Sequence, residues 1–147
     1  MMRQILVAIT IAATLAVSSA SAFDSADLKK LKETNECIGC DLSKADLTKA
    51  YLTGANLIGA DLIGADLTSA NLIGADLIGA NLIGANLTDA NLSKANLSKA
   101  NLNGADLSKA KLSGANLKGA ILDYTIMDGA ILCNTTMPDG SDIYSGC

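Results

Sequence analysis

The sequence contains no histidine, no tryptophan and a single proline among its 147 residues, and only 3% of the chain is aromatic. The lack of histidine excludes an imidazole-based catalytic triad and any metal site with a histidine ligand. The scarcity of aromatic rings argues against a stacking groove for single-stranded nucleic acid. A net charge of −4 has the wrong sign for binding a duplex. We therefore expect no nucleic-acid partner and no cofactor.

The first 22 residues have the features of a signal peptide. Arg3 precedes an apolar run from Ile5 to Val17, and Ala20-Ser21-Ala22 has the small-x-small pattern that a signal peptidase accepts. The run is shorter than the ~20 residues that span a bilayer, which disfavours an uncleaved membrane anchor. We expect an exported chain that begins at Phe23, in the periplasm first of all, with the thylakoid lumen or the extracellular space as alternatives, and with no membrane attachment after cleavage.

Most of the remaining chain repeats every five residues. From Leu42 to Leu132 every fifth residue is Leu, except for Met127, and Ala usually stands two positions earlier. On one helix these leucines would spiral around every face, and on one strand they would alternate between faces. An inward Leu and Ala in each repeat therefore requires the chain to bend in each repeat and to coil around a narrow core. Gly follows two residues after Leu in many repeats, where its permissive backbone suits such a bend.

The aligned hydroxyl residues Thr48, Thr68, Thr88 and Ser108 make four short sides per turn plausible without requiring them. The segments Ala-Asn-Leu-Ile-Gly at 55–59 and Ala-Asp-Leu-Ser-Lys at 105–109 resemble the pentapeptide-repeat family. The resemblance extends over residues 40–134. It implies an all-β solenoid, a right-handed quadrilateral parallel β-helix with four pentapeptides per turn, in which the central Leu and the preceding Ala point inward.

Both ends of such a coil need covers, because a solenoid leaves unpaired edges and an open core there. We expect a signal peptide at 1–22, an N-terminal cap at 23–39, the repeats at 40–134 and a C-terminal cap at 135–147. The N-terminal cap contains a short helix from Ser25 to Glu33, with Ser25 as its N-cap residue. At the other end Ile121, Ile126 and Ile131 replace the usual outward Asp or Asn, and we expect the C-terminal tail to cover them.

The four cysteines lie in the two expected caps. In an exported chain they are expected to form disulfides, and in a straight column distance favours pairing Cys37 with Cys40 and Cys133 with Cys147. The Cys37-x-x-Cys40 spacing is also that of a thiol redox site, although the surrounding βαβ pattern of such proteins is missing. A zinc site of four cysteines would require the two ends to meet, so we expect no metal.

Five isoleucines form the most distinctive outward feature of the middle repeats. Ile58, Ile63, Ile73, Ile78 and Ile83 follow the central Leu, where Ser or Thr is usual. With four sides per turn they would form one band over three sides. The band has two interpretations: β-branched residues suit short stacked strands, or a contiguous apolar surface marks an interface.

No catalytic constellation is visible, because the outward Asp and Asn belong to the repeat itself, so we expect no enzymatic activity. The sequence predicts an exported structural or protein-interaction module. Its partner would be an unidentified protein or a second copy, since residues 51–93 carry only acidic charges and residues 94–118 mainly Lys. The resemblance brings one alternative, a DNA mimic that binds topoisomerases, but residues 45–120 contain six Asp and six Lys and are neutral. The second alternative is a thiol redox protein acting through Cys37 and Cys40.

Overall fold

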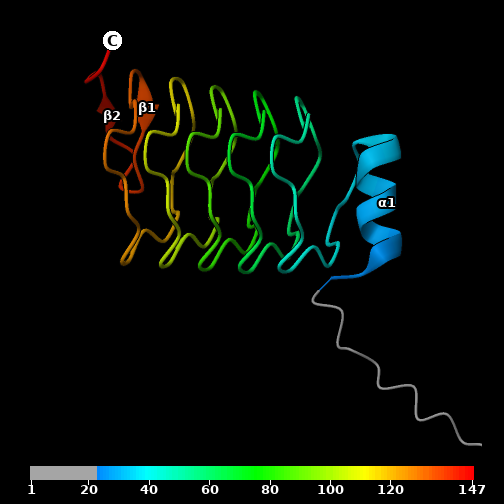
Figure 1. The fold of residues 1–147 in the computed structure, drawn as a ribbon. Coiled ribbons are helices and arrows are strands. Elements are labelled where there is room, and N and C mark those ends of the chain that lie inside the picture. The colour runs from blue at the N-terminus through cyan, green and yellow to red at the C-terminus, as the bar shows by residue number, and fades with distance from the viewer. Residues whose placement is uncertain (1–22) are drawn as a thin grey trace, which may run out of the picture.

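The computed structural model describes residues 23–147, so the signal peptide expected at 1–22 lies outside the described residues. The described chain forms a helix, then a stack of turns, then a short hairpin at the far end (Figure 1). Helix α1 spans Ser25–Thr34, strand β1 spans Thr135–Thr136, and strand β2 spans Asp142–Ile143 and pairs with β1 in antiparallel fashion. Within residues 23–147 no helix has the length and apolarity needed to cross a bilayer.

The stacked turns are held together by parallel bridges between residues 20 positions apart. The first bridge joins Glu36 to Asn56 and the last joins Asn116 to Thr136. Each turn therefore contains four pentapeptides. Pairing begins before residue 40, where the repeats were expected to start, because Cys37 takes the place of the central Leu and its N–H donates to the carbonyl of Asn56 at 2.7 Å.

Each pentapeptide forms one short side and one corner. At the corner, the N–H of Ala donates to the carbonyl of the Leu three residues earlier, at 2.8–3.1 Å across the repeats. The residue before that Ala has a positive φ at every corner, for example 64° at Gly74 and 56° at Ser69, as a β-turn with a left-handed third residue requires. Since the corner occupies most of the five residues, each side contributes a single bridging residue. Of the elements described, only β1 and β2 are strands of more than one residue, so the expected all-β solenoid exists as a ladder of single bridges.

The core is a narrow column of Leu and Ala. Nearly every Leu and Ala in register between Leu42 and Ala120 is buried, and Leu82 is completely so. Cys37 and Cys40 continue this core at its start, in a Leu and an Ala position respectively. In the last turn Leu122, Met127 and Leu132 are only partly buried.

Helix α1 lies across the N-terminal end of the column (Figure 1). Leu31 is buried, and Phe23 and Leu28 pack partly against the core. The N-cap residue is Asp24, which corrects the expectation of Ser25: Asp24 has an extended backbone and accepts a hydrogen bond from the N–H of Ala26 at 2.8 Å, whereas Ser25 is already helical.

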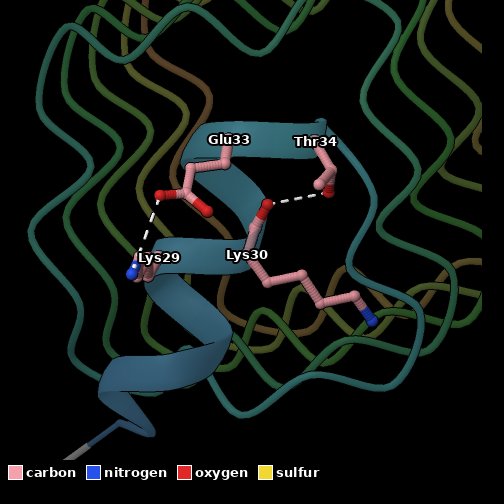
Figure 2. A network of polar contacts seen from close by, with 4 residues as sticks. All are labelled: Lys29, Lys30, Glu33 and Thr34. Carbon is pink, nitrogen blue, oxygen red and sulfur yellow. Dashed lines mark hydrogen bonds and ion pairs between the residues drawn. The ribbon is translucent and has the colours of Figure 1, made fainter.

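Helix α1 makes polar side-chain contacts within itself and to the first turn of the column. Figure 2 shows Lys29 beside Glu33 at 3.9 Å and the Thr34 hydroxyl donating to the carbonyl of Lys30 at 2.8 Å. The Lys29–Glu33 pair is exposed, so it contributes little to stability. The Asp27 carboxylate accepts the N–H of Asp41 at 2.8 Å, which satisfies a backbone donor at the edge of the column.

Candidate interaction surfaces

Outward Asp and Asn side chains complete the backbone hydrogen bonding of the column. In a typical repeat three N–H groups donate to neighbouring turns and a fourth closes the corner. The remaining N–H, on the residue after Leu, donates to the side-chain oxygen of the Asp or Asn two residues before it, as from Ser93 to Asn91 at 3.1 Å. This contact recurs at all fourteen bridging positions that carry Asp or Asn, from Asp41 to Asn116. The outward carboxylates and amides are therefore structural groups, a role that the period of five did not reveal.

The same contacts act on the acidity of some carboxylates. The Ser43 hydroxyl and N–H lower the pKa of Asp41, and the corresponding groups of Ser108 lower the pKa of Asp106. The pKa of Asp46 is lowered by Thr48 in the same way. These carboxylates are held ionised as acceptors, which is the opposite of what a general acid needs at neutral pH.

The surface of residues 23–147 offers no pocket for a small molecule. Within the same residues no three Cys, Asp or Glu side chains converge into a metal-binding group. What the described chain presents to other molecules is therefore a set of flat sides, four corners and two ends.

The cysteines form one disulfide at each end of the column. Cys37 and Cys40 are bonded, with Cα atoms 5.2 Å apart, and both side chains are buried. Cys133 and Cys147 are bonded, with Cα atoms 4.9 Å apart. The first bond closes the first corner beneath α1, and the second ties the end of the chain to the last turn. This is the pairing that the distance between the two ends favours.

The isoleucine band is less exposed than the outward position of its residues in the repeat suggests. Ile58, Ile63, Ile73 and Ile78 are half-buried, and Ile83 is 38% exposed. Neighbouring turns cover part of each side chain, because positions 20 residues apart stack directly. The N–H of each isoleucine donates to the Asp or Asn before it, so these residues also serve the ladder.

The C-terminal tail covers less than expected. Gly146 lies against Ile131, close to its Cγ2 and Cα atoms. Ile121 and Ile126 remain 45% and 46% exposed, so the expectation that the tail covers all three isoleucines is wrong for these two. The physical reason is reach: the hairpin of β1 and β2 and the bond to Cys133 hold the short tail over one part of the last turn.

Lysine stems run along the corners of the column. The Cγ of Lys94 lies over Gly114 one turn later, and Lys44 and Lys109 lie in the same way over Gly64 and Gly129. A Cβ at Gly114 would stand 3.4 Å from that Cγ, so a glycine corner leaves room for the lysine of the previous turn. The 20-residue spacing of Lys and Gly could have shown this pairing in the sequence.

Comparison with known proteins agrees with this architecture. A model of pentapeptide repeats matches the chain in eight copies over residues 36–72, 70–108 and 100–137. A pentapeptide repeat protein from the Arabidopsis thaliana thylakoid lumen is 30% identical, with a TM-score of 0.54, over 69% of this chain and 64% of its own. This chain thus aligns with less than two thirds of the Arabidopsis protein.

A second solved structure is similar over nearly its whole length. Rfr23 from the cyanobacterium Cyanothece 51142 is 29% identical, with a TM-score of 0.59, over 71% of this chain and 92% of its own. No curated protein matches the sequence. Since the repeat model spans well over half of the chain, this protein belongs to the pentapeptide repeat family.

Proposed function

We propose that the protein is an exported, non-enzymatic module that acts by presenting its column to another protein. The observation that carries the proposal is the pair of disulfides, one sealing each end of the column. Structural disulfides persist in oxidising compartments outside the cytoplasm. The similarity to a protein of the thylakoid lumen supports the same placement. Among such compartments we propose the periplasm first and the thylakoid lumen second, and we propose the right-handed coil that the family implies.

The surface supports an interaction role better than a chemical one. The described residues offer no pocket, and their outward carboxylates are engaged by backbone N–H groups. The redox alternative requires an accessible thiol pair, whereas Cys37 and Cys40 lie in the core beneath α1. The DNA-mimic alternative requires a strongly acidic column, whereas residues 45–120 carry equal numbers of Asp and Lys.

Mass spectrometry of protein isolated from its own compartment tests the export proposal. We expect a chain that begins at Phe23 and whose mass is lower by four hydrogens than that of the reduced chain, because two disulfides are formed. A chain that retains residues 1–22 and carries four free thiols would refute export.

The isoleucine band is the first surface to test for partner binding. Changing Ile58, Ile63, Ile78 and Ile83 together to Thr should leave the fold intact, since Thr also suits this position in the repeats. If the band is a contact surface, this variant loses the partners that the wild-type chain captures from the envelope fraction. If every partner is retained, the isoleucines serve only the stacking of the turns.

A further inference from the structure

The two ends of the column are covered to different degrees. Beneath α1, the first leucines Leu42, Leu47 and Leu52 are at most 2% exposed. At the other end Leu122 and Met127 are only partly buried, and the neighbouring Ile121 and Ile126 are about half exposed. Contiguous apolar surface of this kind usually marks a site of interaction.

The same two sides pair with the preceding turn but have unpaired backbone groups on their outer edge. One turn earlier, the N–H of Leu102 donates to the carbonyl of Ile121 at 2.8 Å. The equivalent N–H groups of Leu122 and Met127, and the carbonyls of Ala120 and Thr125, have no hydrogen-bond partner within residues 23–147. Each of the two sides thus presents a free acceptor and a free donor on either side of an exposed isoleucine, which is the pattern of an open sheet edge.

The tail restricts this opening to half of the end. On the third side the N–H of Leu132 and the carbonyl of Ala130 also lack a hydrogen-bond partner among residues 23–147, but Gly146 lies against Ile131 and the Leu132 nitrogen and covers that side. On the fourth side β1 continues the chain and pairs with β2. The free edge therefore consists of the sides centred on Ile121 and Ile126.

Charge decides which occupant suits the edge. Residues 119–147 contain Asp123, Asp128, Asp139 and Asp142 and no Lys or Arg. The stems of Lys99, Lys109 and Lys118 reach the margin of this end at Gly119, Gly129 and Gly140, so acidic groups still outnumber basic ones there. A second copy docked C-terminal end to C-terminal end would bring the same acidic residues against these, and like charges oppose that contact. A copy docked head to tail would present helix α1, which offers no strand to pair with the edge. A segment that carries Lys or Arg would instead be attracted, and the attraction would weaken with added salt.

We propose that the C-terminal end of the column, formed by the sides of Ile121 and Ile126, binds a basic segment of a partner protein that turns once at the corner between the two sides and adds one bridge to each. The partner's backbone pairs with the free groups of Ala120, Leu122, Thr125 and Met127, as in other cases of strand addition to a sheet edge. Its apolar side chains cover the two isoleucines, and its basic side chains face Asp123 and Asp128. The proposal names a partner for the interaction module proposed above and rests on that role.

The test uses the purified protein with both disulfides formed and a synthetic peptide of alternating Lys and Val as the probe. Amide signals of Leu122 and Met127 should shift in the NMR spectrum and exchange with solvent more slowly when peptide is added. A peptide of alternating Glu and Val should leave them unchanged. In the double variant Ile121→Lys and Ile126→Lys, binding should be lost, because lysine on an edge strand opposes pairing.

Two further variants distinguish binding at the C-terminal edge from non-specific attraction of the basic peptide to the protein. Ile83→Lys changes a comparably exposed isoleucine in the middle of the column and should bind the peptide as wild type does. Asp123→Asn with Asp128→Asn should weaken binding about two- to tenfold, as expected for exposed charge pairs. Unmoved signals of Leu122 and Met127 at saturating peptide, or undiminished binding by the double lysine variant, would overturn the proposal. Protection of these amides that rises with protein concentration in the absence of peptide would also overturn it, in favour of a second copy. If envelope partners are lost when the isoleucine band is changed to Thr but retained in the double lysine variant, the protein is an interaction module whose binding surface is the band and not the C-terminal end.

Discussion

Replacing a corner glycine by alanine isolates the cost of the left-handed corner. Gly74 has φ of 64°, and an added Cβ would meet no atom within 4 Å, so the substitution changes backbone energy without a steric clash. An L-residue in the left-handed region costs about 1–2 kcal/mol. Loss of the glycine's freedom in the unfolded chain returns about 0.4–1 kcal/mol. We therefore expect Gly74→Ala to lower the free energy of unfolding by about 1 kcal/mol, by the difference of these two.

Urea unfolding with both disulfides intact measures this effect through the shift in midpoint at constant slope. Gly74→Asn is the matched control and should cost less, since Asn enters the left-handed region more readily. Ser69→Gly is the reverse change, because Ser69 already has φ of 56°; it should stabilise the fold by about 0.5–1 kcal/mol. The reasoning would be refuted if Gly74→Ala left the midpoint unchanged, or if Ser69→Gly destabilised the protein.

Three other predictions address the core, the carboxylates and the disulfides. Leu82→Asp should abolish cooperative folding in urea titrations, because it places an unpaired charge at a fully buried site and costs more than about 4 kcal/mol. Asn81→Asp should have a small effect, since Asp accepts the same hydrogen bond. Equal effects of the two substitutions would contradict the assignment of Leu82 as inward and Asn81 as outward. The pKa of Asp106 is lowered, so its contribution to stability is present above the ordinary pKa of 3.8 and is lost as the pH falls below that value. The Asp106→Asn variant should therefore lose less stability between pH 5 and pH 2 than the wild-type protein does. Identical pH profiles would contradict the hydrogen-bond account. Mild reductant should open the disulfide at the exposed C-terminus before the buried one beneath α1, as mass spectrometry of alkylated protein would show; the reverse order would contradict the burial of the N-terminal pair.

The sequence was sufficient to predict the repeating unit because the burial pattern of each pentapeptide can be read within its own five residues. A Leu and an Ala in fixed register determine which side chains are buried. Gly marks many of the corners, but Lys, Ser and Tyr adopt positive φ at others, where the coil imposes it. The helix at 25–34 was also predictable from its local pattern. Its N-cap was misplaced by one residue, since both Asp24 and Ser25 are suitable caps. The tertiary contact that fixes this point is the N–H of Asp24, which donates to the carbonyl of Asp41 in the first turn at 3.0 Å.

The role of the outward Asp and Asn could not be predicted from their position alone. Their side chains accept from a backbone N–H two residues later, a contact that exists only because the corner brings the two groups together. The exposure of Ile121 and Ile126 was equally hidden, since the sequence shows a tail without showing how far it reaches.

The sequence by itself therefore determined that the chain coils every five residues around Leu and Ala, because burial and backbone preference act within each repeat. Only the tertiary structure decided which unpaired backbone groups stay uncovered. The hairpin and the bond between Cys133 and Cys147 hold the tail over one half of the last turn, and in the other half the unpaired donors and acceptors lie beside the exposed Ile121 and Ile126. This difference arises from contacts between segments far apart in the chain, and the pattern within each repeat does not predict such contacts.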